Sequence, residues 1–227
     1  MAVNTEAYQS IKQELEVKQV TLVAISKIKP VEDILALYEL GQRDFGENYV
    51  QELVDKQARL PKDIRWHYIG HLQSNKVKYI APFVQLIHGV DSFKLLKEIN
   101  KEAGKNNRVI DVLLQVHIAQ EETKFGLSED ELKTIYNKNS DGLHELKNVR
   151  VCGFMGMASF SDDLEKVRGE LRSLKSLFDW YADVPIVNSQ FSILSMGMSG
   201  DYKIAIEEGS TMVRIGSLLF GARNPVK

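Results

Sequence analysis

The 227-residue sequence contains one cysteine and no long apolar run, and each absence narrows the class of protein. Cys152 alone cannot form an intramolecular disulfide, and it lies in the apolar stretch V-C-G-F-M-G-M, so we expect a buried thiol in a reducing cytoplasm. No stretch reaches the length of a membrane-spanning helix, and the N-terminus has neither the basic nor the apolar region of a signal peptide. The sequence therefore predicts a cytoplasmic protein without a membrane partner.

An excess of charge of one sign is also missing. The chain has 29 Lys and Arg against 31 Asp and Glu, which gives a formal net charge of −2. Proteins that bind nucleic acid through its phosphates need a basic surface, so we expect no nucleic-acid partner. Hydrophobic residues make up 44% of the chain, which is enough apolar material for a full core and argues against disorder.

Short apolar runs alternate with segments of helical period along the whole chain. The strands that we expect are Thr21–Ser26, Asp44–Gly46, Trp66–Gly70, Leu86–Val90, Val109–Ile118, Val151–Met155, Phe191–Leu194 and Met212–Ile215. The helices that we expect are Thr5–Val17, Val31–Glu39, Tyr49–Ala58, Ser74–Ala81, Ser92–Ala103, Ser128–Lys138, Ser161–Tyr181 and Tyr202–Glu208. Ser74, Ser92, Ser128 and Ser161 are predicted helix N-caps.

Eight strands that alternate with helices predict an α/β fold with parallel strands. The length suits a single (β/α)8 TIM barrel domain that spans residues 1–227. An open doubly wound sheet is the alternative. The first strand is followed by K-I-K-P rather than by a glycine-rich phosphate turn, which disfavours a nucleotide-binding sheet of that kind. In a barrel, functional residues gather where the strands end.

Lys27 follows the first buried strand directly. A lysine at that position can be partly desolvated, which lowers the pKa of its amine and favours a Schiff base with a carbonyl group. A solvated lysine at a strand end is the alternative for this segment alone.

The ends of the seventh and eighth strands carry small residues. Gly216 and Ser217 fit the phosphate-binding loop of a barrel, and Ser195 with Gly197 and Ser199 could supply a second wall. Ordinary loop glycines and serines are the alternative.

Arg214 lies inside an apolar strand, so its charge requires a partner. A core carboxylate such as Asp44 or Glu47 is one candidate, and an acceptor on a ligand, such as a ring nitrogen, is the other. His67 and His71 lie four residues apart in a strand and loop rather than on a helix, so we expect no metal site there.

Five motifs together resemble the pyridoxal phosphate homeostasis protein family, the YggS/PROSC-like group. They are A-I-S-K-I-K-P, D-F-G-E-N-Y-V-Q-E, W-H-Y-I-G-H-L-Q-S-N-K, L-S-M-G-M-S-G-D and G-S-T-M-V-R-I-G-S-L-L-F-G-A-R. They occur in the same order, and the match runs from near residue 20 to Arg223. The resemblance implies a barrel that binds pyridoxal 5′-phosphate (PLP) and is similar to the N-terminal domain of alanine racemase, fold type III, without the C-terminal β domain.

The resemblance also assigns roles to individual residues. It implies that Lys27 forms the internal aldimine and that Arg214 faces the pyridine nitrogen. It implies a cofactor-binding set of Lys27, Asn48, His71, Ser195, Arg214, Gly216 and Ser217, in which Ser195, Gly216 and Ser217 bind the phosphate and Asn48 and His71 lie near the cofactor. Lys124 and Arg223 match recurrent family positions without an assigned role.

The leading interpretation is a monomeric PLP carrier without catalytic turnover, which transiently meets PLP-dependent apo-enzymes. An arginine at the ring nitrogen keeps that nitrogen neutral, and a neutral ring is a poorer electron sink. The sequence ends at Lys227 without the domain that supplies a second base in racemases. One alternative is a PLP-dependent enzyme similar to an amino-acid racemase. Another is a cofactor-free barrel enzyme in which Lys27 forms a Schiff base with a phosphorylated metabolite.

Overall fold

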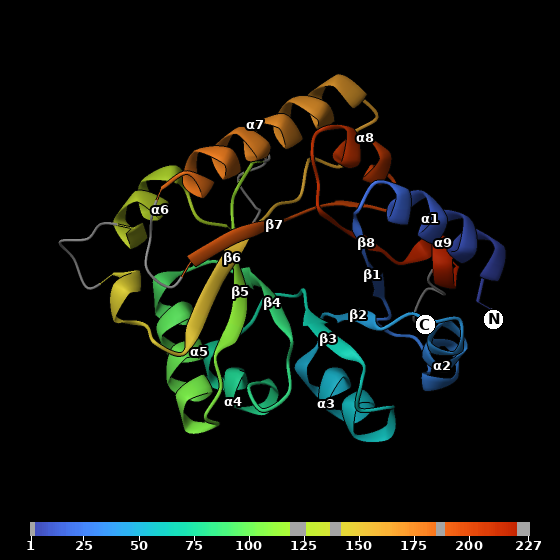
Figure 1. Ribbon diagram of the computed structural model, residues 1–227, viewed down its shortest axis with the longest axis horizontal. Coiled ribbons are helices and arrows are strands. Elements are labelled where there is room, and N and C mark those ends of the chain that lie inside the picture. The colour runs from blue at the N-terminus through green and yellow to red at the C-terminus, as the bar shows by residue number, and fades with distance from the viewer. Residues whose placement is uncertain (1–2, 119–125, 137–141, 185–188, 222–227) are drawn as a thin grey trace.

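Eight parallel strands close into a barrel in the order in which they occur along the chain, and β8 pairs with β1 (Figure 1). The computed structural model describes residues 3–118, 126–136, 142–184 and 189–221. The strands are β1 Thr21–Ile25, β2 Asp44–Glu47, β3 Arg65–Tyr68, β4 Leu86–Val90, β5 Ile110–Gln115, β6 Val149–Met155, β7 Ser189–Met198 and β8 Met212–Ile215. The predicted (β/α)8 barrel is confirmed.

Helices cover the outside of the barrel (Figure 1). They are α1 Thr5–Val17, α2 Val31–Glu39, α3 Val50–Arg59, α4 Val77–Ile80, α5 Phe93–Lys105, α6 Glu129–Tyr136, α7 Leu164–Ala182, α8 Tyr202–Glu207 and α9 Ser217–Phe220, with 3-10 turns η1 Ser74–Lys76 and η2 Leu143–Glu145. Helices α1 and α9 lie side by side, and the Asn4 N–H donates to Leu219 O at 2.8 Å. Within the described ranges, no helix has the length and apolar composition that crossing a bilayer requires.

Local sequence signals set most element boundaries, and β7 is the main exception. Strands β4 and β8 and helices α1 and α2 have the predicted bounds. Strand β7 was expected to end at Leu194, but it continues to Met198. The extra residues read S-M-G-M, and Gly197 has a φ of +94° that a strand pattern does not suggest.

Two of the four predicted N-caps are correct. The Ser92 hydroxyl accepts from the Leu95 N–H, and Ser128 with Glu131 forms a capping box. Ser74 caps no helix, because it begins the 3-10 turn η1. Ser161 is also wrong, since α7 begins later, with Asp163 as its N-cap.

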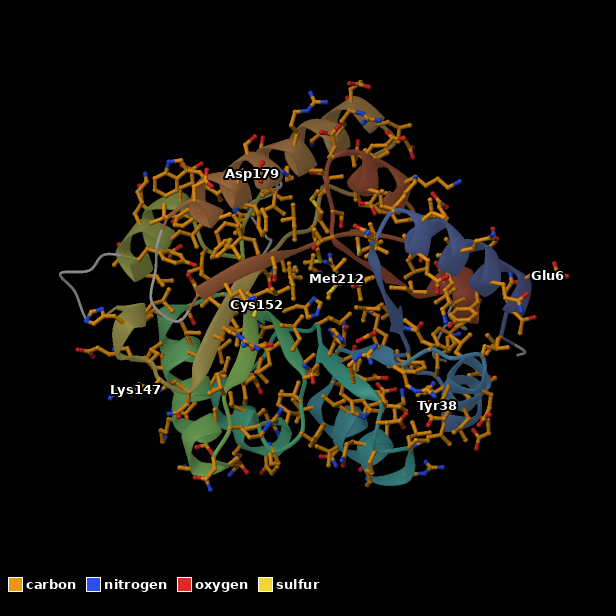
Figure 2. All side chains as sticks on the ribbon, in the orientation of Figure 1. Glu6, Tyr38, Lys147, Cys152, Asp179 and Met212 are labelled. Atoms are coloured by element: carbon orange, nitrogen blue, oxygen red, sulfur yellow. The ribbon has the colours of Figure 1, made fainter. Side chains whose placement is uncertain are left out.

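The apolar core has two parts, separated by the ring of strands. The larger part fills the space between strands and helices, and a smaller cluster that includes Val23, Leu113, Cys152 and Met212 fills the inside of the barrel. Figure 2 shows Cys152 and Met212 toward the middle of the molecule. Cys152 is buried as predicted, and burial raises the pKa of its thiol to about 11. An un-ionised thiol of this kind is inert.

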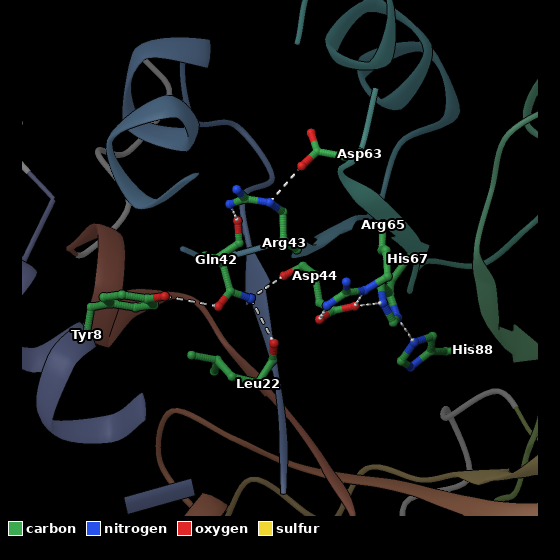
Figure 3. A network of polar contacts seen from close by, with 9 residues as sticks. All are labelled: Tyr8, Leu22, Gln42, Arg43, Asp44, Asp63, Arg65, His67 and His88. Carbon is green, nitrogen blue, oxygen red and sulfur yellow. Dashed lines mark hydrogen bonds and ion pairs between the residues drawn. The ribbon is translucent and has the colours of Figure 1, made fainter. Parts of the chain in front are cut away.

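Paired charges close the face of the barrel at which the strands begin. Asp44 and Arg65 stand opposite each other on β2 and β3, and the Arg65 Nε donates to Asp44 Oδ1 at 2.7 Å. The His67 Nε2 lies 3.0 Å from the same carboxylate oxygen (Figure 3). Asp111 and Arg150 repeat this cross-strand pairing on β5 and β6. These contacts position the strands relative to one another.

We predict that Asp44→Asn reduces the free energy of unfolding at pH 7 by about 1–2 kcal/mol. Burial acts to raise the pKa of Asp44, but the hydrogen bonds and charges of Arg65 and His67 outweigh it and lower that pKa from 3.8 to about 2. Because the folded-state pKa is depressed, the stabilisation is present above about pH 4 and is lost as the pH falls toward about 2. Urea unfolding followed by circular dichroism over this range measures the effect.

The variant should therefore show a flatter pH dependence between about pH 4 and 2 than the parent protein. Asp130→Asn, on the exposed face of α6, is the matched control and should leave the slope unchanged. An unchanged slope in Asp44→Asn would contradict the prediction.

Candidate ligand-binding site

A cavity of about 840 Å³ opens at the face where the strands end. Its lining comes from the ends of β1, β2, β3, β7 and β8, from the segment that follows β6 and from the start of α7. Of the predicted site residues it brings together Lys27, Asn48, Arg214, Gly216 and Ser217. The predicted concentration of functional groups at this face is therefore present in the structure.

Lys27 enters the cavity from a tight turn between β1 and α2. The turn is closed by the Lys29 N–H, which donates to Ser26 O at 3.0 Å. Lys29 also lines the cavity, but its ammonium donates to Phe220 O at 2.7 Å and is thereby directed toward that carbonyl. The cavity lining therefore contains two lysines, and the ammonium of Lys29 is bound to a backbone carbonyl.

Asn48 presents a polar atom that needs a partner. Its backbone carbonyl accepts from the Tyr68 hydroxyl at 2.9 Å, and a Cβ on Gly70 would come within 2.3 Å of the same oxygen, so glycine is required for this close approach. Its Oδ1 is buried and has no hydrogen-bond partner. Buried acceptors without a partner are rare, and this one belongs to a residue of the cavity wall.

Part of the cavity wall is made of small residues from the ends of β7 and β8. Ser199, Gly200, Gly216 and Ser217 line it, and the Gly216 N–H donates to the Ser199 hydroxyl at 3.2 Å. Ser199 was noted from the sequence only as part of a second wall, and the structure places it in the lining. It directly follows the true end of β7.

Ser195 corrects the predicted phosphate-binding set. Its side chain is fully buried inside the barrel, where its Oγ contacts Arg214 and His88, and it does not line the cavity. The error follows from the length of β7, because a strand that ends at Met198 leaves Ser195 inside the sheet.

His71 also lies away from the cavity. Its side chain is about half exposed, and its Nδ1 is 2.9 Å from Asp91 Oδ2. It is absent from the described lining of the cavity, because β3 ends at Tyr68 and the following loop carries it outward. The predicted Lys124 and Arg223 lie outside the described residues.

Arg214 is buried at the base of the cavity, with 4% of its surface exposed. Its Nη1 donates to Ser195 O and Ser195 Oγ, both at 2.7 Å, and its Nη2 donates to Gly156 O at 3.0 Å. These hydrogen bonds go to neutral oxygens rather than to Asp44 or Glu47, the carboxylates considered as one alternative. Burial lowers the pKa of Arg214 to about 10, so the guanidinium remains charged at neutral pH.

A chain of hydrogen bonds connects Arg214 with Asp44 through the barrel interior. Ser195 Oγ is 3.1 Å from His88 Nδ1, His88 Nε2 is 2.9 Å from His67 Nδ1, and His67 Nε2 is 3.0 Å from Asp44 Oδ1. Figure 3 shows the end from Asp44 to His88. Burial lowers the pKa of His88 well below its usual value, so this ring is neutral.

Two ends of this chain have fixed roles. Arg214 can only donate, so the Ser195 hydroxyl accepts from it, and the Asp44 carboxylate accepts from His67 Nε2. The neutral His88 donates from one ring nitrogen and accepts at the other. The chain therefore joins the buried cation to Asp44 through a continuous series of hydrogen bonds.

In the part of the chain that the structure describes, no group of three or more His, Cys, Asp or Glu side chains is arranged to hold a metal ion.

Comparisons with known proteins agree with this geometry. The family described as alanine racemase, N-terminal domain, matches residues 5–224. The pyridoxal phosphate homeostasis protein of Aquifex aeolicus is 44% identical over 203 residues, which cover 89% of this chain and 86% of the relative. That of Haemophilus influenzae is 37% identical over 208 residues, which cover 90% of this chain and 86% of the relative.

Solved structures extend the comparison. PipY of Synechococcus elongatus with PLP bound matches with a TM-score of 0.85 and 32% identity, over 95% of this chain and 99% of PipY. Alanine racemase of Bartonella henselae matches with a TM-score of 0.70 and 15% identity, over 99% of this chain and 62% of the racemase, and shows a shared fold. The chain therefore belongs to the pyridoxal phosphate homeostasis protein family, built on the barrel of the alanine racemase N-terminal domain.

Proposed function

We propose that this protein binds PLP in the cavity at the strand ends and holds it as a Schiff base with Lys27, without catalytic turnover. The observation that carries the proposal is the convergence of a lysine, a buried arginine and a wall of small residues on one cavity. The relative PipY, which binds PLP, supports it.

The residues present fit the chemical groups of this cofactor. The Lys27 amine would form a C=N bond with the aldehyde carbon of a bound cofactor, and the carbonyl oxygen would leave as water with the two amine protons. Arg214 lies at the base of the cavity, where its charge disfavours protonation of the ring nitrogen. The unpartnered Asn48 Oδ1 offers an acceptor to a ligand donor.

The phosphate group fits the wall of Ser199, Gly200, Gly216 and Ser217. Serine hydroxyls can donate to phosphate oxygens, and glycines allow the backbone to approach them. At Gly216 an added Cβ would lie 3.3 Å from Ile25 atoms, so a larger residue would crowd the wall. PLP carries the matching anion on the ring carbon next to the one that bears its aldehyde.

Three features favour a carrier over a catalyst. In the described part of the lining there is no histidine, tyrosine or cysteine to act as a second base. A neutral pyridine ring is a poor electron sink. The mouth of the cavity is edged by the exposed apolar side chains of Phe160, Leu164 and Met198, which suits transient contact with PLP-dependent apo-enzymes.

A PLP-dependent racemase-like enzyme is the second candidate. The match to the alanine racemase N-terminal domain favours it, and the Bartonella henselae alanine racemase with the same barrel has covalently bound pyridoxal phosphate.

We predict that Lys27→Ala abolishes the visible absorption band of the Schiff base. Without its amine no C=N bond can form, and borohydride should then trap no PLP on this residue. Absorption spectra before and after reduction, followed by peptide mapping, measure both effects. Lys29→Met is the matched control and should keep the band, because its ammonium is bound to Phe220 O. An adduct that maps to a residue other than Lys27 would contradict the proposal.

We predict that Ser217→Ala and Ser199→Ala each weaken PLP binding about three- to tenfold, the effect of losing one hydrogen bond. Pyridoxal, which lacks the phosphate, should bind these variants as it binds the parent protein. Titration with both ligands separates the two contributions. Ser192→Ala, on the exposed start of β7, is the control. Equal losses for PLP and pyridoxal would show that these serines do not contact the phosphate.

We predict that the PLP-loaded protein racemises amino acids far more slowly than enzymes turn over, at well under roughly 1 per second. Exchange of the α-proton of L-alanine in deuterated water, followed by NMR, measures the rate. Rates in the range of roughly 1–10³ per second would favour the racemase-like candidate instead.

A further inference from the structure

The turn that carries Lys27 adopts a conformation that its own residues disfavour. Ile28, the next residue, has a φ of +61°. This left-handed region is a genuine outlier for a β-branched side chain, and positive φ at the third position of a turn ordinarily calls for glycine or asparagine. Such a conformation persists only where surrounding contacts enforce it. The contacts around this turn therefore determine where the Lys27 amine points.

Lys56 supplies these contacts from the neighbouring helix α3. Its side chain is almost fully buried, and its Nζ donates to Ser26 O at 2.7 Å, to Glu47 Oε1 at 2.7 Å and to Glu52 Oε1 at 2.6 Å. An ammonium group has three N–H donors, and here each has an acceptor. One cation thus joins the end of β2, the helix α3 and the residue that precedes Lys27.

The carboxylates of Glu47 and Glu52 also bind the turn directly. The Ser26 hydroxyl donates to Glu47 Oε1 at 2.6 Å, and the Ile28 N–H donates to Glu52 Oε1 at 2.6 Å. The residues on both sides of Lys27 are therefore bound to the same buried group of charges. The strained φ of Ile28 places its N–H where Glu52 can accept from it.

The energetics favour a geometric role for this group. Glu47 is fully buried, and burial raises its pKa to about 7 despite the Lys56 charge beside it. Its Oε2 has no hydrogen-bond partner. Buried ion pairs contribute little to stability compared with apolar residues of similar size, and their best-attested role is to fix one arrangement.

Lys56 lies behind the turn rather than in the cavity. With Glu52 and Lys29 it lines a separate, shallower depression of about 480 Å³, and it is absent from the described lining of the main cavity. The turn forms the wall between the two. Lys56 therefore acts on a ligand through the residues that it binds, which are Ser26 before Lys27 and Glu47 before Asn48.

We propose that Lys56, with Glu52 and Glu47, is a positioning residue for Lys27: it holds the turn in the conformation that presents the amine to an aldehyde in the cavity. The inference deepens the proposed function and rests on it. Holding the amine at the reacting carbon raises its effective concentration, so capture of the aldehyde is faster and the Schiff base more stable.

The test compares two ligands on full-length Lys56→Met. PLP can form the Schiff base, whereas pyridoxine 5′-phosphate carries an alcohol in place of the aldehyde and reports only the phosphate and ring contacts. We expect capture of PLP to be slower and weaker by at least about tenfold, the size of losing a hydrogen bond to a charged group. The affinity for pyridoxine 5′-phosphate should be unchanged. Stopped-flow absorbance and competition titration measure the two quantities.

Two sets of controls separate positioning from general stability. Arg108→Met removes a cation that donates to the carbonyls of Ala81 and Val84 at the opposite face of the barrel, and it should leave PLP capture unchanged. Glu52→Gln keeps an oxygen that accepts from Ile28 N–H and should retain most of the capture rate. Glu52→Ala removes this acceptor and should behave like Lys56→Met.

The outcomes distinguish the two proposals. Unchanged capture in Lys56→Met, or equal losses for PLP and pyridoxine 5′-phosphate, would overturn the positioning role. If Lys56→Met fails to fold, the Glu52→Gln and Glu52→Ala pair decides the question by the same criteria. If the parent protein itself gives no borohydride-trapped PLP at Lys27, the proposed function fails instead.

Discussion

The burial of the Arg214 charge is the constraint on which the interior of the barrel depends. A guanidinium remains protonated, so its charge must be supported wherever the fold places it. Two carbonyl oxygens and a serine hydroxyl accept from it directly, and the histidine pair extends the support to Asp44 at the far face. One part of the barrel interior is therefore polar, while the part around Val23 and Leu113 is filled by apolar side chains.

Two buried cations serve the site in different ways. The described hydrogen bonds of Arg214 go to neutral acceptors, so none of them pairs its charge with a carboxylate. Lys56 is bound by two carboxylates and a carbonyl oxygen, and its charge is compensated locally. The charge of Arg214 therefore acts on the cavity electrostatically. The compensated charge of Lys56 acts by fixing the positions of the residues that it binds. The arginine lines the cavity, and the lysine lines the separate depression behind the turn.

Local patterns in the sequence were sufficient for the barrel and for much of the site. Asn48 and Gly216 directly follow a strand, Lys27 is the second residue after one, and strand ends can be recognised from short apolar runs. Ser195 was misplaced because a positive φ at Gly197 lets β7 continue where the pattern suggests a turn. The chain from Arg214 to Asp44 and the contacts of Lys56 could not be predicted, since they join residues far apart in sequence, and a lysine on a charged helix is typical of a solvated face.

A carrier and a catalyst place different demands on the same barrel. Both must hold an aldehyde reversibly and position its phosphate. A catalyst must also stabilise negative charge at the substrate carbon and move protons on both of its faces, which requires a protonated ring or further acids and bases. A guanidinium at the base of the cavity works against the first requirement, and a lining whose described acids and bases are lysines and aspartates offers little toward the second. A carrier needs neither, and its Schiff base can be released by any amine that reaches the mouth of the cavity, because exchange of one imine for another needs no stabilised carbanion. The same groups that limit catalysis are therefore compatible with holding a reactive aldehyde and passing it on.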